Sequence, residues 1–145
     1  MTVVAKILQS KPDATVHTIA PTASVFDALK LMADKGIGAL VVTEGDAIVG
    51  IFTERDYARK IALLGRTSAA TLARDVMTTS VRFVRPEQTS EQCMQIMSNN
   101  RLRHLPVVEN EKLVGMISIG DLVKDIISEQ KFIIEQLEQY ITGHR

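Results

Sequence analysis

The chain contains two copies of one sequence unit. When the sequence is shifted by 65 residues, positions 16–61 align without a gap on positions 81–126, and ten of these 46 positions are identical. Most other pairs keep their polar or apolar character in register, whereas chance would give about two or three identities. A duplication at this period indicates one supersecondary unit built twice, which limits the possible folds more than any other feature of the sequence.

Each copy predicts the same order of elements. A short extended piece leads into a proline, and Ser24 or Thr89 then stands where the N-cap of a helix belongs. Apolar residues at helical spacing follow, and two short β-branched runs separated by a polar turn come after them. Asp56 or Asp121 is expected to open a second helix. The order is β-α-β-β-α in each half, which predicts an α/β (α+β) fold. The predicted strands are 16–19, 39–42 and 47–52 in the first copy, and 81–84, 105–108 and 113–117 in the second.

The end of the chain predicts one long amphipathic helix. Residues 121–141 carry apolar side chains largely on one broad face, and Lys and Glu fill much of the rest. Beyond residue 128 this apolar stripe lies outside the repeat, so it must pack on its own module, on a second copy or on another protein. We therefore expect a first repeat with an N-terminal segment at 1–68, a second repeat at 69–128 and a C-terminal helical extension at 129–145.

The composition narrows the class of protein. Lys plus Arg and Asp plus Glu both number 17 among the 145 residues, so the chain lacks the basic excess typical of a nucleic-acid binder. No apolar run approaches the about 18 residues of a membrane span, and the start lacks the apolar segment of a signal peptide. The single cysteine, Cys93, excludes an internal disulfide. We expect a cytoplasmic protein that binds neither nucleic acid nor membrane.

Four short motifs resemble the CBS domain family, named after cystathionine beta-synthase, in the form of a tandem pair. They are Asp-Val-Met-Thr at 75–78, Arg-His-Leu-Pro-Val-Val at 103–108, and the strand-to-helix segments 50–56 and 115–121. The resemblance implies two repeats packed sheet to sheet about a pseudo-twofold axis, with two clefts between them. It also implies a regulatory role, binding of adenosine-containing ligands such as AMP, ADP, ATP or NAD, and association into homodimers.

Two hydroxyl-x-x-aspartate pairs are the sharpest candidates for a binding site. Thr53 and Asp56 occupy the same positions in the first repeat as Ser118 and Asp121 in the second. A carboxylate can accept hydrogen bonds from both hydroxyls of a ribose, and a hydroxyl three residues earlier can donate to a phosphate. An aspartate at a helix start is also a common cap, but the duplication together with the family resemblance favours ribose binding.

The basic residues differ between the repeats. Arg55 has Gly120 as its counterpart, whereas Arg103 and His104 stand where the first repeat has Gly38 and Ala39. The resemblance places Arg55, Arg103 and His104 near bound phosphates. We read Arg101 as a solvated surface residue. The two clefts are therefore expected to be chemically unequal and to favour a phosphorylated ligand.

Five residues lie where the family pockets hold an adenine between apolar side chains and backbone groups. Packing into the core is an equally good interpretation for each of them, and we expect Cys93 to be an inert buried thiol. The five residues are Ile19, Ile37, Ala39, Phe83 and Leu102.

Taken together, these features predict a regulatory module that binds an adenine nucleotide (AMP, ADP, ATP or NAD(H)). It would sense the energy or redox state of the cell and signal to a protein partner, as a homodimer. No required cofactor, metal site or catalytic group is expected, because the sequence offers no activated nucleophile or metal-ligand cluster. The alternative is a ligand-free dimeric scaffold that recruits a partner through its C-terminal helix.

Overall fold

The computed structural model describes residues 2–143 and divides into two compact units. The first-repeat unit contains residues 15–83 and the hairpin tip 108–114. The second-repeat unit contains the chain up to residue 14, residues 84–107 and the chain from residue 115 onward. The mixed α+β architecture predicted from the repeat is confirmed.

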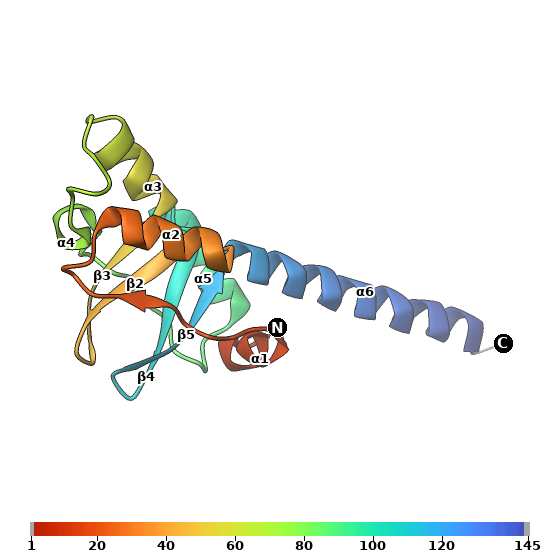
Figure 1. Ribbon diagram of the computed structural model, residues 1–145. Coiled ribbons are helices and arrows are strands. Elements are labelled where there is room, and N and C mark those ends of the chain that lie inside the picture. The colour runs from red at the N-terminus through yellow and green to blue at the C-terminus, as the bar shows by residue number, and fades with distance from the viewer. Residues whose placement is uncertain (1, 144–145) are drawn as a thin grey trace. The chain divides into compact units, whose positions relative to one another are not determined.

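A three-stranded sheet with a helix packed on it forms the first-repeat unit (Figure 1). Strand β1 pairs with β2 in parallel, and β2 pairs with β3 in antiparallel register with a bulge between Val42 and Thr43. The predicted helix starts at its cap, because the Ser24 hydroxyl accepts from the Asp27 backbone N–H at 3.0 Å. The elements are β1 (Thr18–Ile19), α2 (Val25–Lys35), β2 (Ala39–Glu44), β3 (Ala47–Thr53), α3 (Glu54–Asp56), the π-helical turn η1 (Tyr57–Ala62) and α4 (Ala73–Val76).

The second-repeat unit follows the same plan with a smaller sheet. Its strands β4 and β5 form a pair, and a single parallel bridge joins Val84 to Val107. That bridge corresponds, at the 65-residue offset, to the pairing of Ile19 with Val42 in the first repeat. The elements are α1 (Val4–Ser10), α5 (Ser90–Asn100), β4 (His104–Glu109), β5 (Lys112–Ser118) and α6 (Ile119–Gly143).

Corresponding residues form the two cores. Three of the identical pairs, at positions 32/97, 40/105 and 42/107, are buried in both units. Cys93 is fully buried, as is its counterpart Ala28. The repeat preserves these positions because each unit buries its helix against its own sheet through them.

Each repeat is completed by the segment that precedes the other repeat in the sequence. Helix α1 belongs to the second-repeat unit, where the Val4 backbone N–H donates to the Gln88 carbonyl at 2.8 Å. Helix α4 belongs to the first-repeat unit, where Ala73 donates to Ala23, also at 2.8 Å. Gln88 and Ala23 correspond at the 65-residue offset, so the two contacts are equivalent. The N-terminal segment thus packs in the second-repeat unit, and the domain division at 1–68, 69–128 and 129–145 stays a prediction.

A glycine lies under each of these preceding segments. A Cβ on Gly50 of β3 would meet the Met77 side chain and would approach the Thr78 carbonyl oxygen to 3.0 Å. A Cβ on Gly115 of β5 would approach Leu8 to 2.7 Å. The backbone contact makes the close approach strict at Gly50, whereas at Gly115 the Leu8 side chain could move aside.

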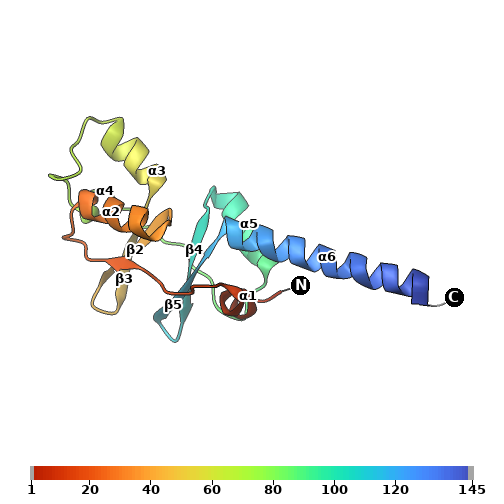
Figure 2. The same cartoon turned by 45° about the vertical axis from the view of Figure 1, so that its right-hand side comes forward.

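Helix α6 is longer than any other element. Its first residues pack in the second-repeat unit, where Leu122 is fully buried, and its C-terminal half extends beyond α1 and α5 of the same unit (Figures 1 and 2). Among the residues that the structure describes, no helix is both long enough and apolar enough to cross a membrane.

The close approach at Gly50 predicts a stability change that can be measured. The Thr78 carbonyl accepts from the Ile51 N–H at 2.9 Å, and this hydrogen bond holds the carbonyl in place. A methyl group on Gly50 would therefore crowd a carbonyl oxygen that is fixed by the backbone. Gly50→Ala should lower the free energy of unfolding by about 1–3 kcal/mol in chemical denaturation. Gly120→Ala is the matched control, because its Cβ would meet its nearest neighbour at 3.6 Å within a helix. The control should leave stability unchanged or raise it by up to about 1 kcal/mol. Equal stability of the two variants would contradict the close approach.

Candidate functional site

An aspartate carboxylate stands at the strand-to-helix junction of each repeat. The Thr53 N–H donates to the Asp56 carboxylate at 3.0 Å, and the Ser118 N–H donates to the Asp121 carboxylate at 2.8 Å. In return each hydroxyl accepts from the backbone N–H of the aspartate, at 3.3 and 3.1 Å. The expectation that the aspartates open the helices is corrected: Thr53 is the N-cap, Asp56 is the third helical residue, and α6 likewise begins before Asp121, at Ile119.

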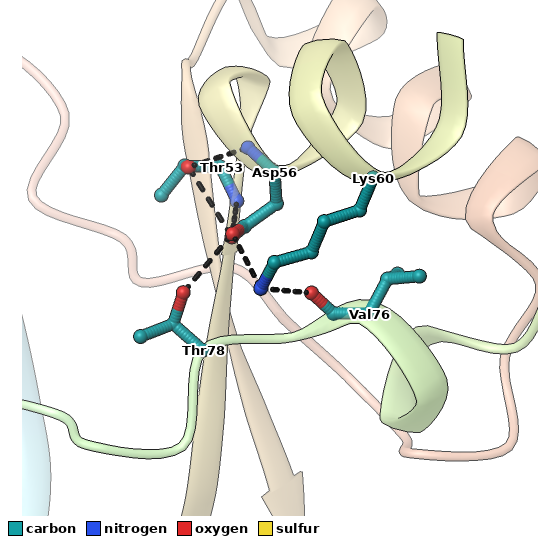
Figure 3. Close-up of polar contacts among 5 residues, drawn as sticks. All are labelled: Thr53, Asp56, Lys60, Val76 and Thr78. Atoms are coloured by element: carbon teal, nitrogen blue, oxygen red, sulfur yellow. Dashed lines mark hydrogen bonds and ion pairs between the residues drawn. The ribbon is translucent and has the colours of Figure 1, made fainter. Parts of the chain in front are cut away.

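The Asp56 carboxylate is bound by the protein through both of its oxygens (Figure 3). Oδ2 faces Thr53, while Oδ1 accepts from the Thr78 hydroxyl at 3.0 Å and from the Lys60 ammonium at 3.1 Å. Lys60 also donates to the Val76 carbonyl at 2.9 Å. Asp56 is buried, with 5% of its surface exposed. A ribose hydroxyl could bind this carboxylate only by replacing one of these internal donors.

The Asp121 carboxylate has a different set of partners. Its contacts converge on Oδ2, which accepts from Ser118 and from the Lys11 ammonium at 3.0 Å. Lys11 follows α1 and also donates to the Met116 carbonyl at 2.9 Å. The Asp121 side chain is 15% exposed, against 7% for that of Asp56. Asp121 thus offers its other oxygen to a ligand at a lower cost in broken contacts.

These partners set the protonation of Asp121. Burial alone raises the pKa of its carboxyl group. The Ser118 N–H and the hydrogen bond and charge of Lys11 outweigh burial, and they hold the pKa below its ordinary value. Asp121 is therefore an anion and an acceptor at neutral pH.

The lysine that contacts the aspartate comes from a different place in each unit. Lys60 lies one helical turn after Asp56, but its counterpart in the second repeat is Asp125, which cannot take this role. Lys11 takes it instead. One carboxylate oxygen of Asp125 is buried without a hydrogen-bond partner among the described residues.

Sequence reasoning missed three of these partners. The spacing of Lys60 four residues after Asp56 was a usable signal, and Thr78 belongs to the motif at 75–78. No local signal connects Lys11 to Asp121, because most of the chain separates them.

In the second-repeat unit, the backbone of Arg103 lies against the start of the helix that carries Asp121. The Arg103 carbonyl accepts from the Ile119 N–H at 2.8 Å, which brings the start of β4 against the start of α6. Arg103 is exposed and His104 is half-buried. The segment that carries Arg103 and His104, the Asp121 carboxylate and the start of α6 are thus neighbours, an arrangement that suits a ligand with both hydroxyl and phosphate groups.

The first-repeat unit has the same backbone arrangement with a different set of basic residues. Gly38 accepts from the Glu54 N–H at 3.2 Å, in the place of Arg103 and Ile119. Arg55 is exposed on α3. Arg101 is also exposed, and it ends α5 in the left-handed conformation (φ 54°) that Gly36 adopts at the end of α2 (φ 65°). The structure thus gives Arg101 a position at the end of a helix, in keeping with a surface role.

The predicted adenine-pocket residues have mixed surroundings. Ile37 lines a surface hollow of about 410 Å³ together with Gly38 and Glu54, and Ala39 pairs with Thr53 in the β2–β3 register. In the first-repeat unit the hollow and the Thr53 junction are therefore neighbours.

The remaining residues of that set are divided between packing and exposure. Ile19 and Ile37 pack against the core of the first-repeat unit and Leu102 against the core of the second, the packing role kept open by the sequence analysis. Phe83 is half-exposed. Burial raises the pKa of the Cys93 thiol, and this agrees with an inert side chain.

Comparison with known proteins identifies the repeated unit. A family model described as the CBS domain matches residues 4–63 and 73–128. The mitochondrial CBS domain-containing protein CBSX3 of Arabidopsis thaliana is 42% identical over 125 residues, which cover 83% of this chain and 61% of that protein. The chain thus spans less than two thirds of that relative's length.

Two solved structures extend the comparison. A CBS-domain protein from Burkholderia ambifaria, which its name assigns provisionally to signal transduction, is 54% identical with a TM-score of 0.86, covering 89% of this chain and 96% of that one. The hexameric CBS-CP12 protein of bloom-forming cyanobacteria is 30% identical with a TM-score of 0.74, covering 85% of this chain and 70% of that one.

The contact between Lys11 and Asp121 predicts a pH-dependent stability. Because the folded-state pKa of Asp121 is lowered, its contribution is present above the unfolded-state pKa of about 3.9 and is lost as the pH falls through the folded-state value. Lys11→Met should lower the free energy of unfolding at pH 7 by about 1–2 kcal/mol, after allowance for the partly exposed side chains. The difference from the wild type should narrow below about pH 4. Unfolding curves across pH measure this.

Lys6→Met is the matched control, because Lys6 is an exposed lysine on α1, the helix that Lys11 follows. It should follow the wild type at every pH. A constant difference between Lys11→Met and the wild type from pH 7 to pH 3 would contradict the role given to Lys11.

Proposed function

Because the chain belongs to the CBS domain family and carries two copies of the domain, we propose that it is a regulatory module that binds an adenine nucleotide and signals its presence to a protein partner. The ligand class is AMP, ADP, ATP or NAD(H). The module would thereby respond to the energy or redox state of its compartment.

The junction around Asp121 carries this proposal. It combines an ionised carboxylate with an accessible oxygen, the start of α6, and the neighbouring Arg103 and His104. The carboxylate suits the hydroxyls of a ribose. A guanidinium suits a phosphate through paired N–H donors. A nucleotide carries both groups, whereas adenosine alone would leave the cations without an anion.

The two repeats should bind nucleotide unequally. Asp56 already receives hydrogen bonds on both oxygens, and a ligand there must displace Thr78 or Lys60. Asp121 can receive a hydroxyl while it keeps Ser118 and Lys11. We therefore assign the tighter ribose contact to Asp121 and a weaker one, if it forms, to Asp56.

Lys11 offers a route from the ligand to the rest of its unit. It joins the Asp121 carboxylate to the Met116 carbonyl and follows directly on α1. A hydroxyl bound to Asp121 would change the balance of these contacts. The bound state would be favoured by the difference in ligand affinity between two arrangements, as any regulatory response requires.

Self-association and a protein target complete the proposal. The CBS-CP12 relative is described as hexameric, and self-association is extended to this chain as part of the proposal.

The competing function is a ligand-free dimeric scaffold that recruits a partner through its C-terminal helix. The internal saturation of Asp56 is the observation in its favour, since a carboxylate with four protein contacts serves folding well without any ligand.

A thermal-shift panel tests nucleotide binding directly. AMP, ADP, ATP, NAD, NADH and S-adenosylmethionine are compared at rising concentration. A ligand present at 100 times its dissociation constant should stabilise the protein by about 2.7 kcal/mol. Adenosine without phosphate is the control and should act more weakly. No shift with any member of the panel at millimolar concentration would refute the proposal.

Substitution of the two aspartates separates the nucleotide module from the scaffold. Asp121→Asn should weaken the tightest ligand of the panel by about 10–100-fold in isothermal titration calorimetry, because a charged acceptor is lost. Asp56→Asn should mainly lower the free energy of unfolding, by about 1–3 kcal/mol, because it breaks a capping box and the ion pair between the buried carboxylate and the partly exposed Lys60. The scaffold instead predicts that neither variant changes partner binding, and a stronger loss of affinity in Asp56→Asn would reverse our assignment of the sites.

A further inference from the structure

Helix α6 presents an apolar stripe that its own unit does not cover. Every residue from Gln130 to Thr142 is exposed. Several are large hydrophobic residues with more than half of their surface in water, from Ile133 at 51% to Tyr140 and Ile141 at 66%. Large exposed hydrophobic groups in this number mark an interaction surface.

The exposed residues share one side of the helix. At 100° per residue, the stripe runs along α6 with the three- and four-residue spacing of a packed helix. Glu135 and Phe132 lie on the opposite side, whereas Lys131 and Glu138 lie along one edge of the stripe. The stripe consists of Ile127, Ile133, Ile134, Leu137, Tyr140 and Ile141.

This part of α6 gains little stability from packing on its own unit. It propagates from the packed start of a 25-residue helix, so nucleation is already achieved, but most helical stability in proteins comes from packing of an amphipathic face. The described contacts of the unit cover Leu122 at the start of α6 and leave the stripe exposed.

The size of the stripe approaches that of a specific protein interface. Its six residues expose on the order of 700 Å² on each copy, which is the upper limit that pairing could bury, against roughly 800 Å² buried per partner in a standard-size specific interface. The charges argue against a lipid surface as the occupant, because acidic residues outnumber basic ones along α6.

Two features of the stripe fit a second copy of the chain. Gln130 lies within it, and an amide that both donates and accepts can pair with its own copy across a twofold axis. The edges of the stripe carry charges of both signs, at Glu129, Lys131 and Glu138, so two stripes that meet do not bring only like charges together. An isologous contact needs this self-complementarity, whereas a different protein would have to supply its own match for Gln130.

We propose that the C-terminal half of α6 pairs with the same segment of a second copy, and that this helix pairing is the self-association surface of the protein. The inference rests on the self-association proposed above and names its surface. It does not depend on nucleotide binding at Asp121.

The molar mass of the full chain in solution tests the pairing. We expect the wild type to sediment as an oligomer at equilibrium. The double variant Ile133→Glu with Leu137→Glu should raise the dissociation constant by about 100-fold or more, because two central anchors become charged. Ile134→Glu with Ile141→Glu should act in the same direction. Phe132→Glu is the matched control: Phe132 is 60% exposed but lies away from the stripe, so the mass should not change.

Circular dichroism and thermal unfolding establish that each variant is folded, and the outcomes then separate cleanly. A wild type that is monomeric at every attainable concentration overturns both the self-association and the helix pairing. An oligomer that survives both double variants overturns the helix pairing alone. Dissociation by Phe132→Glu to the same extent also overturns it, because the stripe would then have no special part.

Discussion

In each repeat, the backbone N–H that ends the second hairpin strand donates to the carboxylate of the aspartate three residues later. This bond satisfies one of the free donors at a helix start and fixes the direction in which the helix leaves the sheet. It also holds a negative charge at the end of a strand, beside the carbonyl that joins the first residues of the hairpin to the helix. The element that terminates the sheet is therefore the same element that could receive a ligand.

The local part of this arrangement can be predicted from the sequence. Duplication, helix caps at Ser24 and Thr89, and β-branched runs act over a few residues, so the order of elements and the α+β fold are confirmed. The exchange of α1 and α4 could not be predicted, because it depends on backbone bonds such as that between Val4 and Gln88, whose residues are far apart in sequence. The leading segments also correspond at an offset of 69 rather than 65 residues, as Thr2 and Thr71 show, so a gapless alignment misses them.

The sequence indicates that the surroundings of Asp56 and Asp121 differ, but it does not show which contacts make them differ. The basic residues differ visibly between the repeats, and Arg103 does lie against the start of α6 through its carbonyl. The larger difference is in the carboxylates. Replacement of Lys60 by Asp125 at the matching position removes an internal cation, and a lysine from the other end of the chain replaces it through only one oxygen of Asp121. Alignment of the two repeats reveals that Asp125 stands in the place of Lys60. It does not reveal that Lys11 supplies the positive charge instead.

Whether a position stays the same in the two repeats therefore depends on what its side chain contacts. A glycine under a packed segment and a buried aliphatic residue face the same neighbours in both units, and Gly50/Gly115 and Leu40/Leu105 stay identical. A charge that can be replaced from elsewhere is free to change, as Lys60 and Asp125 show. The residues of α6 beyond the repeat, 130–142, are all exposed. The core of the second-repeat unit takes only the start of that helix, so its folding does not account for the apolar stripe, which fits the pairing of two copies proposed above.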